Sequence, residues 1–254
     1  MSPAQPLTQS VLSTGSFRSS AATHPGAVRD HNEDSFVNRP DLGLWAVADG
    51  AGGHQSGEVA ASLVADTLRA VPTGLTSAQL LAETRLRIAA AHRRLQEEAL
   101  RRGNNDILAT TVVALLARGD HYACLWAGDS RAYLLRGGAL IQLSHDHSFV
   151  QELVDAGEIT PAEAARDLRA NIITRAVGGR EETLTLDKAT NRLHAGDRFL
   201  LCSDGVSKTL AEDEIHRLLA ADDAAAANLI EAALAAQADD NVTAVTIEVL
   251  GGTY

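Results

Sequence analysis

Two short apolar segments of the sequence each run directly into an acidic residue followed by glycine, at Asp49-Gly50 and at Asp204-Gly205. A third acidic pair, Asp239-Asp240, stands just before another strand-like run. Carboxylates placed just outside strand ends can converge at one edge of a sheet, where they repel one another unless a cation neutralises them. Oxygen-only ligands select hard ions such as Mg²⁺ or Mn²⁺. These three places are therefore candidates for a metal site.

More groups of the same kind stand nearer the N-terminus. Glu33 and Asp34 add two carboxylates, and Arg29 precedes them. An arginine among acids could hold an anionic substrate group through two parallel hydrogen bonds. Each feature taken alone has a simpler interpretation, because an Asp-Gly pair is most often only a turn and an isolated surface ion pair contributes little free energy.

Several other kinds of site are not indicated by the sequence. The nine histidines form no HExxH pair, and the Cys/His spacing of a zinc site is absent. The glycine-rich loop 50–57 lacks both the Lys-Ser/Thr ending of a P-loop and a GxGxxG pattern. Cys124 and Cys202 lie inside apolar runs, and neither has the arginine six residues later that a cysteine-nucleophile phosphatase loop would need. They are interpreted as buried thiols in a reducing compartment.

The elements that must position these residues alternate between strand-like and helix-like segments, without a regular βαβ order. Helices are predicted over 58–70, from the capping box at Thr76 to about residue 102, and over about 223–237. Two hairpins are predicted around Gly119 and around Gly137-Gly138. The chain therefore combines helices with antiparallel strands.

Three further capping boxes predict where shorter helices begin. They stand at 148–151, 160–163 and 209–212, the second with proline at the first helical position. The first two open short polar helices set between strands. We interpret the segment 147–177 that contains them as an inserted flap.

Composition limits the partners of the chain. Its 254 residues include 33 acidic and 22 basic side chains, a formal charge of −11. Broad binding to nucleic acid or to an anionic membrane needs a basic surface and is not expected. The apolar stretches are too short to span a membrane, and the polar residues 1–20 do not resemble a secretory signal. We expect one domain over 1–254, with 1–14 as a loosely ordered lead-in, acting as a cytoplasmic monomer.

Together the motifs are more specific than any one of them. They occur in this order: Arg29-Asp-His-Asn-Glu-Asp34, Val47-Ala-Asp-Gly-Ala-Gly-Gly-His54, Gly57-Glu58, Ala127-Gly-Asp-Ser-Arg131, Asp146-His-Ser148, Ser203-Asp-Gly205 and Asp240-Asn-Val-Thr243. This series resembles the PPM-type (type 2C) metal-dependent Ser/Thr protein phosphatases in their bacterial form. The resemblance runs from about residue 15 to residue 249 and includes the flap.

The resemblance implies an α+β fold, a four-layer α-β-β-α sandwich of two antiparallel sheets flanked by helices, with a small helical flap. It implies metal-dependent hydrolysis of phosphoserine and phosphothreonine in proteins by a metal-activated water, with no phosphoenzyme intermediate. The implied partners are phosphorylated proteins and a Ser/Thr kinase system, whose action the enzyme would oppose in a bacterial signalling or secretion pathway.

The resemblance also implies roles for the acidic residues. Asp49 would bridge two Mn²⁺ or Mg²⁺ ions. The backbone carbonyl of Gly50 would bind one of these ions, and Asp204 and Asp240 would bind the other. Glycines at 50, 52 and 53 would let the backbone turn tightly beside the ions.

Four other residues receive roles in the same way. Glu33 and Asp34 would act mainly through metal-bound waters, and Arg29 would hold the substrate phosphate. Asp129, in the Gly-Asp-Ser-Arg motif, would hold a third, weaker ion.

Two positions depart from the pattern of the family. Ala51 stands where eukaryotic members have a histidine proposed as the general acid, and His54 is not assigned that role. Lys208 stands four residues after Asp204, where the family commonly has Asp or Asn. An ammonium group cannot ligate a cation, so this residue puts the third ion in question. Lys208 could contact phosphate instead, or pair with Asp129.

Two other interpretations remain open at this point, and the first of them is non-enzymatic. The chain could be a phosphopeptide-binding module that kept the fold and lost turnover, or a sensor whose flap docks a partner. A phosphate-release assay with added Mn²⁺ separates a binder from an enzyme, since a binder forms no product.

Overall fold

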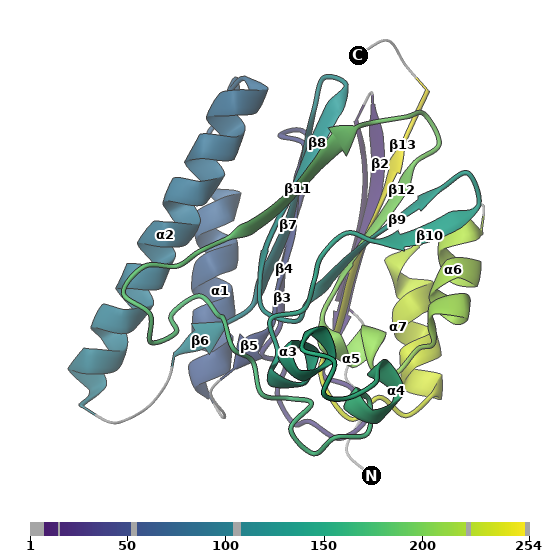
Figure 1. The fold of residues 1–254 in the computed structure, drawn as a ribbon. Helices are drawn as coiled ribbons and strands as arrows, with labels where there is room; N and C mark the ends of the chain where they lie inside the picture. The colour runs from purple at the N-terminus through teal and green to yellow at the C-terminus, as the bar shows by residue number, and fades with distance from the viewer. Residues whose placement is uncertain (1–7, 15, 52–54, 104–107, 222–224, 252–254) are drawn as a thin grey trace.

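Two antiparallel sheets packed face to face form the centre of the molecule (Figure 1). The structure is a computed structural model, and it describes residues 8–14, 16–51, 55–103, 108–221 and 225–251. The six-stranded sheet has the order β1 (Thr8–Thr14), β2 (Phe17–His24), β13 (Val242–Val249), β12 (Arg198–Cys202), β9 (Arg131–Arg136) and β10 (Ala139–Gln142). The five-stranded sheet has the order β11 (Asp187–Arg192), β8 (His121–Ala127), β7 (Val112–Arg118), β4 (Leu44–Ala48) and β3 (Ser35–Arg39).

Helices cover the outer faces of both sheets, which completes the four layers (Figure 1). The helices α1 (Gln55–Arg69) and α2 (Ser77–Arg102) pack on the five-stranded sheet. The helices α5 (Asp204–Ser207), α6 (Glu212–Ala220) and α7 (Ala226–Ala235) pack on the six-stranded sheet. The predicted four-layer α+β sandwich is therefore confirmed.

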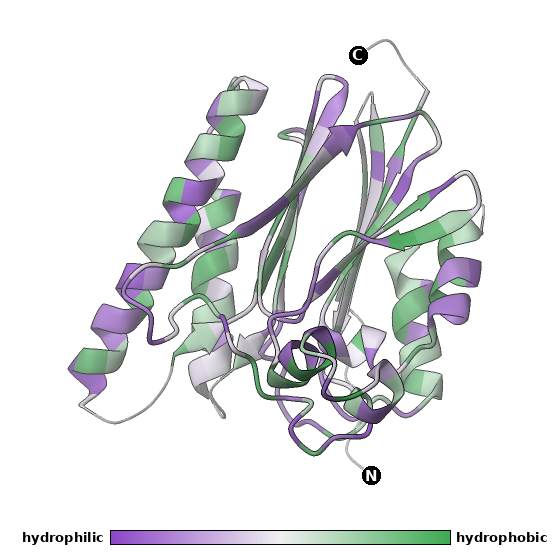
Figure 2. Cartoon of the chain, viewed as in Figure 1, coloured by the Kyte–Doolittle hydropathy of each residue, from purple (hydrophilic) through white to green (hydrophobic). Residues whose placement is uncertain are grey.

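Strand β4 shows why the apolar runs of the sequence are continuous. Trp45 and Val47 point between the sheets, whereas Ala46 and Ala48 point toward α1 and α2. A strand that is buried on both faces has no polar positions to alternate with. The same holds for β12, where Cys202 packs against the outer helices. Figure 2 shows the hydrophobic colour along these central strands and mixed colours on α2 and α6, as expected for helices with one buried face.

The flap follows β10 and precedes β11 in the sequence, and it lies at one end of the sandwich (Figure 1). It contains the short helices α3 (Phe149–Asp155) and α4 (Pro161–Ala164). The predicted capping box before α4 is confirmed, because the Thr160 hydroxyl accepts from the Glu163 N–H and the Glu163 carboxylate accepts from the Thr160 N–H. The end of the flap is held by an isolated bridge between Thr110 and Val177, next to the short strand pair β5 (Gly50–Ala51) and β6 (Ala109–Thr110).

Two sequence-based expectations are corrected by the structure. Residues 8–14 were expected to be loosely ordered, but they form β1, because they pair along their whole length with β2. The capping box at 209–212 does not open a helix, since α6 begins only at Glu212 after an N-cap without a side-chain bond. The Leu210 N–H instead donates to the Val206 carbonyl and its side chain is buried, so this segment closes the turn after α5. Residues 1–7 lie outside the described part of the chain.

Within the described ranges, no helix is both long enough and apolar enough to cross a bilayer.

Candidate active site

The candidate site lies at the edge of the sandwich where β4 and β12 end. Ala48 pairs with Ser35 across β4 and β3, which brings Asp49 and Asp34 to the same end of the five-stranded sheet. In the other sheet, Cys202 pairs with Ala244 on one side and with Arg131 on the other. These registers carry the segment after β12 to a place between the start of β13 and the start of β9. Antiparallel pairing therefore gathers residues from distant parts of the sequence.

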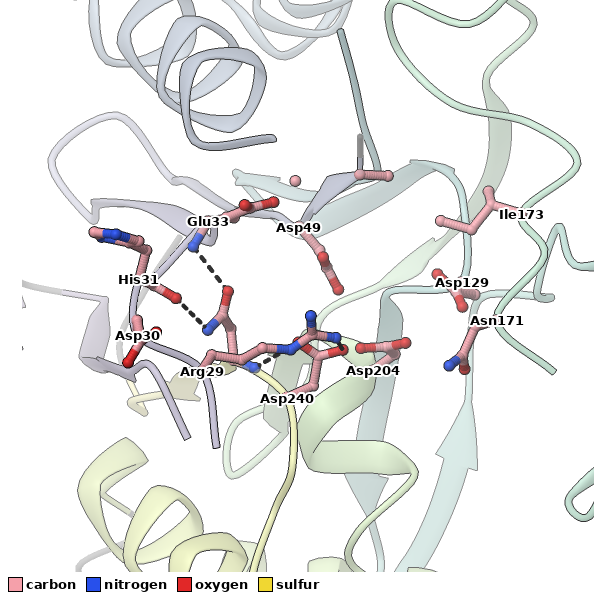
Figure 3. A pocket seen from close by; sticks show the side chains of 13 residues that line it. Arg29, Asp30, His31, Glu33, Asp49, Asp129, Asn171, Ile173, Asp204 and Asp240 are labelled. Carbon is pink, nitrogen blue, oxygen red and sulfur yellow. Dashed lines mark hydrogen bonds and ion pairs between the residues drawn. The ribbon is translucent and has the colours of Figure 1, made fainter. Parts of the chain in front are cut away.

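The gathered residues line an open pocket of about 370 Å³. Figure 3 shows Asp49, Asp204 and Asp240 pointing into it, with Arg29 on one side and Asp129 on the other. Of the eight residues given roles by the sequence, seven line this pocket: Arg29, Glu33, Asp49, Gly50, Asp129, Asp204 and Asp240.

Asp34 is the eighth, and it is buried. Its Oδ2 accepts hydrogen bonds from the Ser203 hydroxyl at 2.8 Å and from the Thr243 hydroxyl at 2.6 Å. Its Oδ1 has no hydrogen-bond partner among the described residues. Burial raises the pKa of Asp34 to about 7, against the effect of the two hydroxyl donors. The Oδ2 atom of this carboxylate therefore links β3, β12 and β13, while Oδ1 is left without a hydrogen bond among the described residues.

Asp49 is held by its backbone. Its N–H donates to the Thr111 hydroxyl at 3.0 Å, and its carbonyl accepts from the Thr111 N–H and the Thr110 hydroxyl, each at 2.8 Å. These bonds leave the side chain to point into the pocket (Figure 3). Burial, followed by repulsion from Asp34 and Asp204, raises the pKa of Asp49 well above its ordinary value.

Gly50 is required by close packing. A Cβ at this position would lie 2.4 Å from the backbone of Gly57 and 2.7 Å from the Glu33 carbonyl oxygen. The sequence suggested a tight turn, whereas the structure shows three backbone segments in close approach. The other two glycines of that expectation, Gly52 and Gly53, and also His54, lie outside the described residues.

Asn241 is a positioning residue to which the sequence analysis gave no role. Its side-chain N–H groups donate to the carbonyls of Pro25 and His31, each at 2.9 Å, and its Oδ1 accepts from the Glu33 N–H at 2.8 Å. One buried amide thus fastens the loop that carries Arg29 and Glu33 to the start of β13. The signal available in the sequence was its place directly after Asp240 in the motif Asp240-Asn-Val-Thr243.

Two cationic side chains pair with the carboxylates of the pocket. The Arg29 guanidinium lies 2.9 Å from Asp240 Oδ2, and this ion pair raises the pKa of Arg29. The Lys208 ammonium lies 2.6 Å from Asp204 Oδ2 and 3.3 Å from Asp129 Oδ2. Of the two contacts that the sequence left open for Lys208, the structure shows the pairing with Asp129.

Asp129 is nearly inaccessible to solvent, with 2% of its side chain exposed. Burial and repulsion from Asp204 raise its pKa to about 6, and Lys208 opposes that rise. Burial alone would lower the pKa of Lys208, but the two carboxylates raise it above its ordinary value. The ammonium is therefore held in its charged form by its partners.

The donor set fits a hard divalent cation. Every predicted ligand offers oxygen, and two buried carboxylate oxygens, Asp34 Oδ1 and Asp129 Oδ1, have no partner among the described residues. Burial first, and repulsion between neighbouring carboxylates second, raise the pKa values of Asp34, Asp49 and Asp129. In the described part of the chain, no group of three or more Asp, Glu, His or Cys side chains is arranged closely enough to hold a metal ion by itself. Arg29 and Lys208 pair with three of the carboxylates of the pocket.

The sequence of the chain is similar to a family of known protein phosphatases. The family model of protein phosphatase 2C matches residues 27–237. The chain is 39% identical over 242 residues to the serine/threonine protein phosphatase PstP of Mycobacterium tuberculosis, across 94% of this chain and 46% of that protein. It is 33% identical over 204 residues to the serine/threonine phosphatase stp of Listeria welshimeri, across 78% of this chain and 81% of that protein. The chain thus spans about half the length of PstP.

Solved structures agree with these matches. PppA of Pseudomonas aeruginosa, described as a key regulatory component of T6SS, superimposes with a TM-score of 0.86 at 41% identity, over 93% of this chain and 99% of that one. The catalytic domain of PstP in complex with two manganese ions superimposes with a TM-score of 0.79 at 37% identity, over 96% of this chain and 100% of that one.

Proposed function

The chain belongs to the protein phosphatase 2C family, and from that premise we propose that it hydrolyses phosphoserine and phosphothreonine in proteins with the help of divalent metal ions. The observation that carries the proposal is the pocket at the strand ends, where five acidic side chains besides Asp49 and an arginine meet from distant segments. The manganese-bound PstP domain, which is 37% identical, supports the metal dependence.

We assign the ion-binding role to Asp49, the Gly50 carbonyl, Asp204 and Asp240, with Glu33 and Asp34 acting through waters. Bound Mn²⁺ or Mg²⁺ would lower the pKa of a water molecule and stabilise negative charge on the phosphoryl oxygens. The residues around these ligands hold them in place: Thr111 fixes the backbone of Asp49, and Asn241 fixes the loop of Glu33.

Arg29 is assigned to the substrate phosphate. Its side chain is 56% exposed and its partner Asp240 is 35% exposed, so the pair is solvated and costs little to separate. A phosphate offers two oxygens to the guanidinium fork, which a planar arginine can engage together. Ala51 lines the same pocket and has no proton to donate, so we assign protonation of the leaving seryl or threonyl oxygen to solvent.

The partners follow from the proposed chemistry. We propose phosphorylated proteins as substrates and a bacterial Ser/Thr kinase system as the opposing activity, in a signalling or secretion pathway. The name of PstP as a serine/threonine protein phosphatase and the description of PppA as a regulatory component of T6SS support this proposal. Cys124 and Cys202 are free and buried, which supports a reducing, cytoplasmic environment. We propose that the domain acts as a monomer.

The test is phosphate release from matched phosphoserine, phosphothreonine and phosphotyrosine peptides. Added Mn²⁺ should give turnover of the first two peptides, and a chelator should abolish it. Binding of the peptides without release in the presence of Mn²⁺ would show a phosphopeptide-binding module and overturn the proposal.

A further inference from the structure

Lys208 joins three segments that the sequence keeps far apart. Its backbone N–H donates to the Asp204 carbonyl at 2.7 Å, which fixes it one turn after that residue at the end of α5. Its ammonium then reaches Asp204 and Asp129, and it donates to Asn171 Oδ1 at 2.8 Å. The Ala170 carbonyl lies at 3.5 Å. The ammonium therefore sits between the pocket and the flap.

Asn171, the flap residue that Lys208 contacts, is connected to the first helix of the flap. The Ile172 carbonyl, one residue beyond Asn171, accepts from the Phe149 N–H at 2.9 Å, and Phe149 begins α3. Asn171 itself lines the pocket together with Asp129 and Asp204 (Figure 3). A bond to Asn171 thus holds both the rim of the pocket and the base of the first flap helix.

The residue type suits this place. The chain has 22 basic residues, and only Lys188 and Lys208 are lysines. An ammonium group directs three N–H donors in different directions, so it can serve oxygens from three segments, whereas a guanidinium presents a planar fork. The choice of lysine at 208 in an arginine-rich chain matches a site with several separate acceptors.

We propose that Lys208 is a positioning residue that acts as a fixed cation. It holds the place between Asp129 and Asp204 that a third metal ion would need, and it ties the flap to the pocket whether or not metal is bound. This inference concerns the architecture of the site and rests on the proposed function only for the identity of the two metal ions.

The first test uses the metal-free protein and does not depend on turnover. Lys208→Met keeps the length of the side chain and removes the charge. Hydrogen exchange of the backbone over 168–174 should become about tenfold faster in this variant, because bonds to a charged donor are lost. The matched control is Lys188→Met, on the exposed side of β11, which should leave that exchange unchanged. Lys208→Arg keeps the charge but not the geometry, and should restore only part of the protection.

The second test counts ions. Titration calorimetry with Mn²⁺ should give two sites in the wild type and a third, weaker site in Lys208→Asp, since a carboxylate then replaces the ammonium beside Asp129 and Asp204. Three ions in the wild type, or unchanged flap exchange in a folded Lys208→Met variant, would overturn the proposal. Absence of phosphate release would overturn only the proposed function, because neither flap exchange nor ion counting measures it.

Discussion

The pocket is flanked by two cation–carboxylate contacts that use the same chemistry in different surroundings. On one side, Arg29 and Asp240 have 56% and 35% of their side chains exposed. On the other side, Lys208 is 37% exposed, but its partners Asp204 and Asp129 are only 17% and 2% exposed. The first contact is a single solvated pair, and the second is shared among several acceptors. Burial of the acceptors, not the identity of the charges, separates the two.

This difference predicts which contact a substrate can replace. A solvated ion pair contributes about 0–1 kcal/mol, so a phosphate can take Arg29 from Asp240 at little cost. Removing the cation from beside a buried carboxylate leaves an uncompensated charge, which is strongly unfavourable. We therefore assign to Arg29 the role of binding the substrate phosphate, and to Lys208 the role of holding the structure of the site.

Both contacts flank Asp49, which we assign to the metal ions. Asp49→Asn should lower the turnover of a phosphopeptide by about 10³-fold or more, because several kcal/mol of metal stabilisation are lost. Without metal, the same change should raise the thermal midpoint, since it removes a buried charge and its repulsion from Asp34 and Asp204. Asp30→Asn, the same charge change at the exposed rim of the pocket, is the control and should change turnover by no more than about twofold. Equal activity in Asp49→Asn and the wild type would remove the centre from the mechanism.

The solvated side can be tested through its cation. Arg29→Met should lower kcat/KM by about 10- to 100-fold, as expected for the loss of charge-assisted hydrogen bonds to a phosphate. The free energy of unfolding should change by less than about 1 kcal/mol, because the pair is exposed. A large loss of stability with little loss of activity would reverse the roles assigned to the two sides.

On the buried side, His147 holds the loop that carries Asp129, because its backbone N–H donates to the Gly128 carbonyl at 3.0 Å. The Gly128 N–H donates to Nδ1 at 3.1 Å, so the neutral ring carries its proton on Nε2. Nε2 lies 3.1 Å from Asp187 Oδ2 and 2.9 Å from the Arg175 guanidinium. Burial, aided by Arg175, lowers the pKa of His147. Its contribution to stability is therefore complete above its unfolded pKa of about 6.5 and is lost as the pH falls further toward the lower folded value.

Lowering the pH should consequently weaken the hydrogen bond that holds the loop of Gly128 and Asp129. Protonation of Nδ1 removes the acceptor of the Gly128 N–H, a loss of about 1–3 kcal/mol. Hydrogen exchange at Gly128 should accelerate below about pH 6 relative to its intrinsic rate. In the variant His147→Gln, this increase in exchange rate below about pH 6 should be absent. An equally large increase in the variant would show that another group causes the acid sensitivity.

The smallest expected effect comes from salt. Raising NaCl from about 0.05 M to about 0.5 M should raise KM for a phosphopeptide by about two- to threefold, because the solvated Arg29 side is screened. Flap exchange over 168–174 should change less, since Lys208 binds acceptors that are largely buried. Equal salt sensitivity of both measurements would show that burial does not separate the two sides.

Strands with apolar, doubly buried runs were predictable, and polar strands were not. β4 and β12 were identified because burial on both faces demands apolar residues. β2 reads Phe-Arg-Ser-Ser-Ala-Ala-Thr-His and was missed, although it is a central strand between β1 and β13. β11 is polar because it is an edge strand, and only its pairing with β8 defines it.

The sequence by itself placed acidic residues directly after buried strands, because a strand that needs an apolar run must end where polar residues begin. It did not determine which cation would pair with which carboxylate, or that Asn241 would fasten the loop of Glu33. Those contacts join residues 208 positions apart, as between Asn241 and Glu33, or 79 apart, as between Lys208 and Asp129. Only the tertiary structure decided them, because the strength of an ion pair or hydrogen bond depends on distance and exclusion of water, and both are set by the packing of the two sheets and the flap.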